Sequence, residues 1–143
     1  MDRLSNSDLS TLIALRRDLH ARPEVSGAEE KTAARIADVL SWIGADQVVT
    51  DLGGHGVAGI FLGAAPGPTV LLRCELDALP IEEATGAAHA STVPGKMHAC
   101  GHDGHTTMLL GAAKYLAETR NFSGSVALIF QPAEEDGGGG GVM

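Results

Sequence analysis

The stretch GKMHACGHDGHTTMLLGAA, from Gly95 to Ala113, most constrains what this chain of 143 residues can form. Within eight residues it contains five side chains of types that proteins use as metal ligands: His98, Cys100, His102, Asp103 and His105. Alternate residues of an extended backbone point the same way, so His98, Cys100 and His102 are expected to face one side. A thiolate and imidazoles gathered on one side of a short segment suit zinc or a neighbouring divalent metal.

An apolar run follows and predicts a helix from about Asp103 to Thr119. Its expected buried face combines four residues at helical spacing: Met108, Leu109, Ala112 and Leu116. Asp103 is expected to cap this helix, because its carboxylate can accept hydrogen bonds from free backbone N–H groups. The alternative is that the histidines form an ordinary turn and Cys100 is a small buried apolar residue. The density of ligand-type side chains favours a metal site over that alternative.

Composition limits the partners and the compartment. The chain is 44% hydrophobic and only 3% aromatic, which predicts one globular core built mainly from Ala, Leu, Val, Ile and Gly. A net charge of −8 argues against nucleic acid or an anionic membrane surface as a partner. Cys74 and Cys100 lie in different settings, so no disulfide is expected and the predicted location is cytoplasmic. The polar N-terminus has the features of neither a signal peptide nor a membrane span.

Two helices are predicted at the start of the chain. The first runs from Ser7 to Ala21, with an apolar stripe at helical spacing. Ser26 and Glu29 form a capping-box pattern at the start of the second helix. This helix runs to Ile43, with Gly44 as its C-cap. Three polar side chains are expected to line the solvated side of the first helix: Arg16, Arg17 and His20.

Alternating hydrophobicity and turn residues also predict a sheet. Four strands are expected: Gln47 to Leu52, Val57 to Leu62, Thr69 to Leu76 and Ser125 to Phe130. The third is the most apolar and is expected to be the most central. A turn at Pro66-Gly67-Pro68 is expected to join the second and third strands like a hairpin. Strands that alternate with helices predict an α/β fold, a layered sheet with helices on both faces.

Acidic side chains follow two of these strands. Glu75 and Asp77 lie at the end of the third strand, and the pair Glu134-Glu135 follows the fourth. Ligands of open α/β sheets bind beyond the carboxyl ends of strands, so these residues are candidates for a site. In a hydrolytic metal centre, one of two adjacent glutamates can bind metal while the other accepts a proton from water. The alternative is a solvated acidic turn, and the chain has two other adjacent glutamate pairs.

Four stretches together resemble one known family. They are RRDLHARPEVSGAEE (Arg16 to Glu30), LLRCELDALPIEE (Leu71 to Glu83), the Gly95 to Ala113 stretch, and GSVALIFQPAEEDGGGG (Gly124 to Gly140). In content and order they are similar to the amidohydrolase branch of the aminoacylase and carboxypeptidase metallopeptidases. That branch includes hippurate hydrolases and indole-acetyl-amino-acid hydrolases, and the similarity covers nearly all of the chain.

The resemblance implies a two-domain, di-metal hydrolase, with an α/β catalytic domain and a smaller lid domain that often mediates dimerisation. It implies two divalent metal ions, with Zn, Mn, Ni and Co all open, and hydrolysis of the amide bond of N-acyl amino acids or related small amides. Three residues match metal ligands of the family: Cys100, His102 and Glu135. Glu134 matches the general base, and Asp77 matches a residue beside the metals that is not itself a ligand. His98 and His105 match no ligand position.

The sequence departs from the family pattern in two respects. Glu75-Leu76-Asp77 stands where the family commonly has Asp-Met-Asp, which lengthens a carboxylate beside the metals. Family members also supply two further histidine ligands and the lid from positions beyond residue 143. Residues 1–143 are therefore expected to be the N-terminal part of the catalytic domain, an incomplete one. Alone they are expected to bind metal weakly and to hydrolyse nothing at a useful rate, with homodimers formed only by the full-length protein.

Two other interpretations remain open. One is a truncated, non-catalytic protein that binds metal or a partner. The other is a thiol hydrolase with Cys100 as nucleophile and His102 or His105 as base, although residues two apart rarely form a working nucleophile–base pair. The sequence leaves the acyl group and the amino acid of the substrate undetermined.

Overall fold

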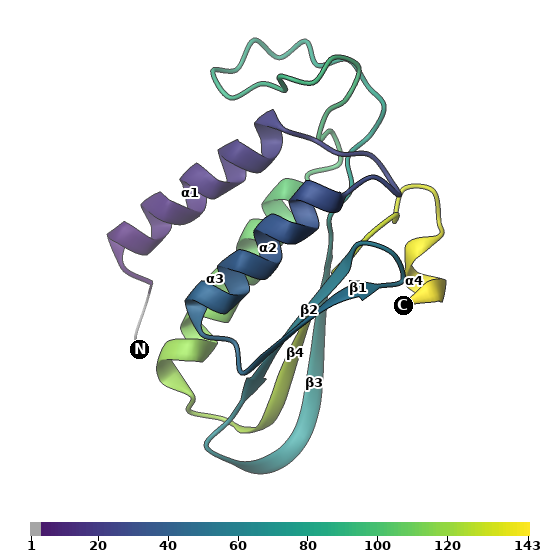
Figure 1. Ribbon diagram of the computed structural model, residues 1–143. Coiled ribbons are helices and arrows are strands. Elements are labelled where there is room, and N and C mark those ends of the chain that lie inside the picture. Colours follow the sequence, from purple (N-terminus) through teal and green to yellow (C-terminus); the bar gives the residue numbers. More distant parts are fainter. Residues whose placement is uncertain (1–3) are drawn as a thin grey trace.

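The computed structural model describes residues 4–143 (Figure 1). Its helices are α1 (Asn6–Ala21), α2 (Glu30–Ile43), α3 (His102–Thr119) and the short α4 (Gly139–Val142), and its strands are β1 (Gln47–Leu52), β2 (Gly56–Leu62), β3 (Ala65–Glu75) and β4 (Ser123–Gln131). All predicted helices and strands are present, with bounds within a few residues of those expected. Among the described residues, none of the helices has the length and apolar character needed to cross a membrane.

The strands form one mixed sheet in the order β1-β2-β4-β3. β4 pairs antiparallel with β2 and parallel with β3, and Glu75 lies opposite Gln131 where the parallel pair ends. The predicted hairpin between β2 and β3 is wrong, because β4 lies between these two strands. The segment Pro66–Pro68 belongs to β3 itself.

β3 occupies an edge of the described sheet, so the prediction that it is central is wrong. Three of its apolar side chains are exposed: Val70, Leu71 and Leu72. An apolar run indicates a strand that can be buried on both faces. The order of strands depends instead on which partners pair with each edge, and composition carries no information about that.

The three long helices lie together on one face of the sheet (Figure 1). α2 packs on β1 and β2, α3 packs mainly on β3, and α1 packs on α3. α4 lies beside the β1–β2 turn, since a Cβ atom on Gly53 would meet Val142. The layered α/β class is confirmed. Of the helices expected on both faces, the three long ones in the described chain share a single face.

The core between the helices and the sheet includes two phenylalanines. The largest fully buried apolar side chains are Phe61, Phe130, Ile36, Leu40, Leu76, Leu110 and Leu128. The expectation of a mainly aliphatic core therefore holds, with two aromatic rings at its centre. Gly59 allows α2 to approach β2 closely, because a Cβ atom at this position would lie 2.8 Å from Cδ2 of Leu40.

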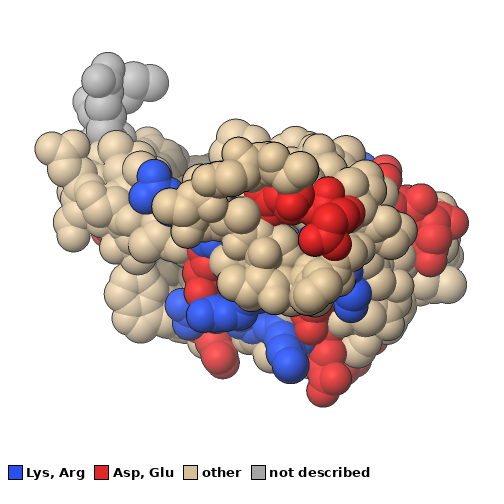
Figure 2. All heavy atoms as spheres, turned by 90° about the horizontal axis from the view of Figure 1, so that it is seen from above, with Lys and Arg blue, Asp and Glu red and all other residues tan. Residues whose placement is uncertain are grey.

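One end of the molecule gathers the predicted functional residues. The carboxyl ends of the parallel strands β3 and β4 meet at the same edge of the sheet. Residues 76–101 connect β3 to α3, and short bridges pair Val25 with Ala78 and Leu79 with Met97. Figure 2 shows the molecule from this end, where one group of acidic side chains lies among uncharged ones near the middle, while acidic and basic side chains lie next to one another along the lower side of the view.

Candidate metal centre

The first turn of α3 and the ends of β3 and β4 bring the predicted metal ligands together. Ligand atoms of Cys100, His102 and Glu135 all lie within 4.8 Å of one another. Cys100 is exposed, whereas His102 is buried at the start of α3. The three residues are thus within reach of a single ion, as the sequence predicted, and their assignment as ligands stays a prediction.

The ring of His102 has a defined orientation. Its Nδ1 lies 2.9 Å from the main-chain carbonyl oxygen of Asp77, which can only accept, so Nδ1 carries the proton in the neutral ring. The lone pair is then on Nε2, which faces carboxylate oxygens of Glu75 at 4.0 Å and of Glu134 and Glu135 at 3.8 Å. These distances are too long for hydrogen bonds. They are short enough for Nε2 and one of these oxygens to bind the same ion, since two ligands each about 2.1 Å from a metal stand at most about 4.2 Å apart.

The negative charge around His102 changes its proton affinity. The hydrogen bond with the Asp77 carboxylate, aided by the Asp77 carbonyl and the charge of Glu75, outweighs burial and raises the pKa of His102 to about 9. The ring therefore attracts a proton because carboxylates surround it. A divalent cation would balance the same charge and would compete with the proton for Nε2.

Asp77 is fully buried beneath this group. Its Oδ2 accepts hydrogen bonds from the Ser26 hydroxyl at 2.7 Å and from the Glu135 N–H at 2.9 Å, and its Oδ1 lies 3.3 Å from Nδ1 of His102. Burial raises the pKa of Asp77, but these hydrogen bonds outweigh it and hold the pKa at about 2. An ionised Asp77 thus orients both His102 and the main chain of Glu135.

A tight turn after β4 carries Glu134 and Glu135. Ala133 in this turn has a φ of 50°, in the left-handed region that L-residues seldom adopt. The glycine run folds back onto the turn, and the N–H of Gly139 donates to the carbonyl of Ala133 at 2.9 Å. A Cβ atom on Gly139 would lie 1.6 Å from the carbonyl oxygen of Pro132, so only glycine fits there.

Two residues expected to cap α2 contribute to this region instead. Ser26 donates to Asp77, 51 positions along the chain, and α2 has no side-chain N-cap hydrogen bond. Glu29 is fully buried, and its carboxylate accepts the N–H of Ala133 at 2.7 Å. The capping-box prediction is therefore wrong, because partners supplied by the tertiary fold engage both side chains.

Asp103 does not cap α3, which has no side-chain N-cap. It is buried, and its Oδ2 is hydrogen-bonded to Nδ1 of His20 and forms an ion pair with Nε of Arg16, each at 2.8 Å. The expectation that Arg16 and His20 line the solvated side of the first helix is therefore wrong, although Arg17 is exposed. The apolar stripe of α1 predicts only where its apolar side chains are buried. It carries no information on the polar side chains of this helix that contact α3.

His98 lies apart from the ligand group. It is buried, and neither of its ring nitrogens has a hydrogen-bond partner among the described residues. Burial lowers the pKa of His98 to about 4, so the ring is neutral near pH 7. His98 belongs to neither group of ligand-type side chains found among the described residues, and the alternation expected of an extended backbone does not extend to His102, which already belongs to a helix.

The donors present fit a divalent cation. Sulfur, nitrogen and oxygen from Cys100, His102 and Glu135 form a mixed set that zinc and its neighbours accept. Oε1 of Glu135 is buried without a hydrogen-bond partner in the described chain, which is costly for an ionised group. The carboxylates of Glu135, Glu134 and Glu75 also raise the pKa of Cys100, which disfavours its thiolate, whereas a bound cation would favour the thiolate.

Comparison with known proteins gives consistent results. The model of the family described as Peptidase family M20/M25/M40 matches residues 71–143. Thermostable carboxypeptidase 1 of Saccharolobus solfataricus is 47% identical over 91% of this chain and 33% of its own length. The IAA-amino acid hydrolase ILR1-like 5 of Arabidopsis thaliana is 45% identical over 90% of this chain and 29% of its own length. The crystal structure of the Bacillus subtilis YXEP protein, described as a dinuclear metal binding peptidase, superposes with a TM-score of 0.91 at 39% identity, covering 95% of this chain and 38% of that one.

The group of Cys100, His102 and Glu135 thus lies at the end of the parallel strands of a mixed α/β sheet. The chain belongs to peptidase family M20/M25/M40, which confirms the resemblance noted in the sequence. It spans about a third of the length of the curated relatives it matches.

Proposed function

We propose that residues 1–143 form the N-terminal part of the catalytic domain of a metal-dependent amidohydrolase. The observation that carries this proposal is the convergence of Cys100, His102 and Glu135 beside Glu134. The substrate class is N-acyl amino acids or related small amides. The similarity to an IAA-amino acid hydrolase supports an acylated amino acid, and the similarity to a carboxypeptidase supports amide hydrolysis more broadly.

In this proposal Cys100, His102 and Glu135 hold a divalent cation. The description of the YXEP protein as dinuclear supports two ions in the complete protein, with Zn, Mn, Ni and Co all compatible with the donors. When bound, the cation polarises the scissile carbonyl and makes a water molecule more acidic. The ring of His102 is held ready for this role by Asp77, whose carbonyl fixes the proton on Nδ1.

The two adjacent glutamates have different roles in this proposal, one as general base and the other as metal ligand. The side chain of Glu134 is 38% exposed, whereas that of Glu135 is 21% exposed and has its N–H held by Asp77. The more accessible Glu134 acts as the general base: it takes a proton from the attacking water and returns it to the nitrogen of the leaving amine. Glu135, anchored through its main chain, is the ligand.

The thiol hydrolase is less compatible with the site. The carboxylates around Cys100 raise its pKa, which lowers the fraction of reactive thiolate near neutral pH. The non-catalytic interpretation predicts a different response to mutation. A protein that only binds metal is indifferent to loss of the general base, whereas an amidohydrolase is not.

The first measurement is the intact mass of the native protein in its source, detected with an antibody against this segment. A species clearly heavier than 14.7 kDa assigns the proposed activity to a longer molecule, whose turnover of N-acyl amino acids is then assayed. In that molecule Glu134→Gln is expected to lower kcat by about 10²- to 10⁴-fold while the bound metal per chain stays constant. Glu118→Gln, at the far end of α3, serves as the matched control.

Three results would count against the proposal. Unchanged turnover in Glu134→Gln would show that Glu134 is not the general base. Loss of bound metal in the same variant would show that Glu134 is a metal ligand. Turnover that a chelator abolishes in the purified 143-residue chain contradicts the expectation that the remaining part of the protein is required.

A further inference from the structure

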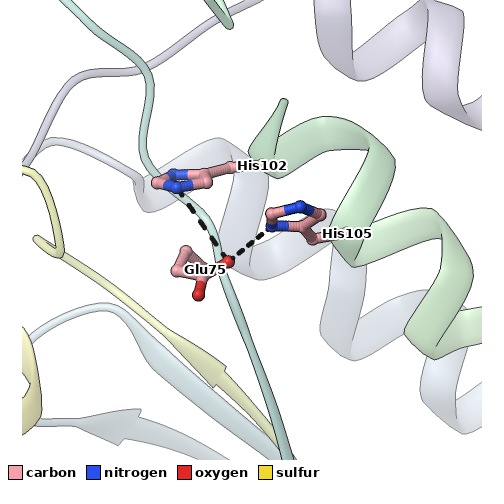
Figure 3. Close-up of side chains that lie close together, drawn as sticks. All are labelled: Glu75, His102 and His105. Carbon is pink, nitrogen blue, oxygen red and sulfur yellow. Dashed lines mark hydrogen bonds and ion pairs between the residues drawn. The ribbon is translucent and has the colours of Figure 1, made fainter. Parts of the chain in front are cut away.

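A second group of ligand-type side chains adjoins the first and shares one residue with it. Glu75, His102 and His105 also place one ligand atom each within 4.8 Å of one another. Figure 3 shows both histidines of the first turn of α3 directed toward the carboxylate at the end of β3. Residues three apart lie on the same face of a helix, which is why α3 presents His102 and His105 together.

We propose that Glu75, His102 and His105 form a second metal-binding triad, which takes a divalent cation through nitrogen and oxygen donors alone. Two imidazoles and one carboxylate are a ligand set that zinc, cobalt, manganese and nickel accept. Of these three residues, only His102 was matched to a ligand position by the sequence motif, whereas Glu75 and His105 were not. It shares His102 with the proposed function, but it requires neither Cys100 nor Glu135.

The geometry of Glu75 supports this role. Its Oε2 lies 2.9 Å from Nδ1 of His105 and 4.0 Å from Nε2 of His102, while its Oε1 pairs with Arg73 at 3.0 Å. One oxygen of the carboxylate therefore faces both rings, while the other oxygen is paired with the guanidinium of Arg73. Its side chain is 12% exposed and that of His105 is 46% exposed, so an ion can enter from the His105 side.

The two triads exclude each other at His102. The single lone pair on Nε2 can bind one ion, because Nδ1 is engaged with the carbonyl of Asp77. A cation on Nε2 is thus drawn toward Cys100 and Glu135 on one side or toward Glu75 and His105 on the other. Thiophilic ions favour the side with sulfur, and harder ions favour the side without it.

The test uses the purified 143-residue chain and Co²⁺, whose absorption spectrum distinguishes thiolate from nitrogen and oxygen ligands. In the wild type, a thiolate-to-cobalt charge-transfer band reports the site at Cys100. In a background that carries Cys100→Ala and Glu135→Ala, this band is expected to vanish while visible ligand-field bands persist. Adding Glu75→Gln or His105→Asn to the background is expected to lower Co²⁺ affinity at least about tenfold.

Glu118→Gln in the same background is the matched control and is expected to leave Co²⁺ affinity unchanged. Absence of Co²⁺ binding in the folded background variant overturns the proposal, as does affinity that is insensitive to Glu75→Gln or to His105→Asn. If the background variant does not fold, Zn²⁺ is titrated into the single variant Cys100→Ala, which lacks the sulfur donor that draws zinc to the other triad, while the ring ¹⁵N signals of its histidines are followed. A shift of the His105 ring signals is then expected, and an unchanged His105 overturns the proposal. The charge-transfer band of the wild type tests the Cys100 site separately. A failure of the proposed Cys100 site can therefore be distinguished from a failure of the second triad.

Discussion

The main-chain carbonyl of Asp77 accepts a hydrogen bond from Nδ1 of His102 at 2.9 Å, and this contact decides what the buried histidine can do. It assigns the proton of the neutral ring to Nδ1 and directs Nε2 toward three carboxylates. The carboxylate of Asp77 adds a second constraint, because it also holds the N–H of Glu135. One buried aspartate therefore positions two of the three residues assigned to the metal.

This relationship predicts the effect of Asp77→Asn. The substitution keeps the size of the side chain and removes its charge, so His102 and Glu135 lose their common ionised partner. Metal affinity of the 143-residue chain is expected to fall about 10- to 100-fold, measured by calorimetric titration with Zn²⁺. Asp38→Asn, on the exposed side of α2, is the control. An unchanged affinity in folded Asp77→Asn would show that this aspartate does not orient the ligands.

The glycine run predicts a local effect on the same site. In Gly139→Ala the new Cβ atom would lie 1.6 Å from the carbonyl oxygen of Pro132, so the turn that carries Glu134 and Glu135 must shift. Metal affinity is expected to fall while the helical content in far-UV circular dichroism stays close to that of the wild type.

Gly141→Ala is the matched control, because nothing lies within 4 Å of a Cβ atom at that position. Equal metal affinities in the two variants would contradict a role for Gly139 in shaping the turn.

Contacts between α1 and α3 predict a loss of stability in His20→Ala. The substitution removes a donor from the buried carboxylate of Asp103, which keeps Arg16 as its other partner. The free energy of unfolding, from urea denaturation, is expected to fall by about 1–3 kcal/mol. Arg17→Ala, on the exposed side of the same helix, is expected to change it by no more than about 0.5 kcal/mol. Equal effects would mean that the polar contact contributes nothing to the packing of α1.

The pH dependence of stability is predicted at Asp46. Its carboxylate accepts the N–H of Leu62 and pairs with Arg120, and the hydrogen bond from Leu62 is the main contact that lowers the pKa of Asp46. A carboxyl group with a lowered folded-state pKa stabilises the fold above its unfolded value of about 3.9, and this contribution is lost as the pH falls through the folded value.

Thermal unfolding of the wild type and Asp46→Asn is expected to show this dependence. The variant should have a lower Tm at pH 7, and the two Tm values should converge as the pH falls below about 3.9. A difference in Tm that is constant from pH 7 to pH 3 would contradict the assignment. Asp38→Asn serves again as the control, with no such convergence expected.

Local signals in the sequence located the helices and strands, because hydrophobic period and helix-ending residues act over a few positions. The second helix ends at Gly44, which has a φ of 94° as expected of a left-handed C-cap. The same local patterns misassigned Ser26 and Glu29 as a cap and Asp103 as another. In each case the local pattern predicted a hydrogen bond to the first N–H groups of the helix itself. The structure shows the polar side chain bonded instead to a partner far away in the sequence.

By itself the sequence determined the α/β class, the family and the proximity of Cys100 to His102, since these follow from residue types and spacing along the chain. Only the tertiary structure decided that β3 lies at an edge, that His20 is buried against Asp103, and that His105 faces Glu75. These facts depend on which segments distant in the chain pack together. Such packing is set by the sum of many weak contacts, and no short stretch of sequence carries it.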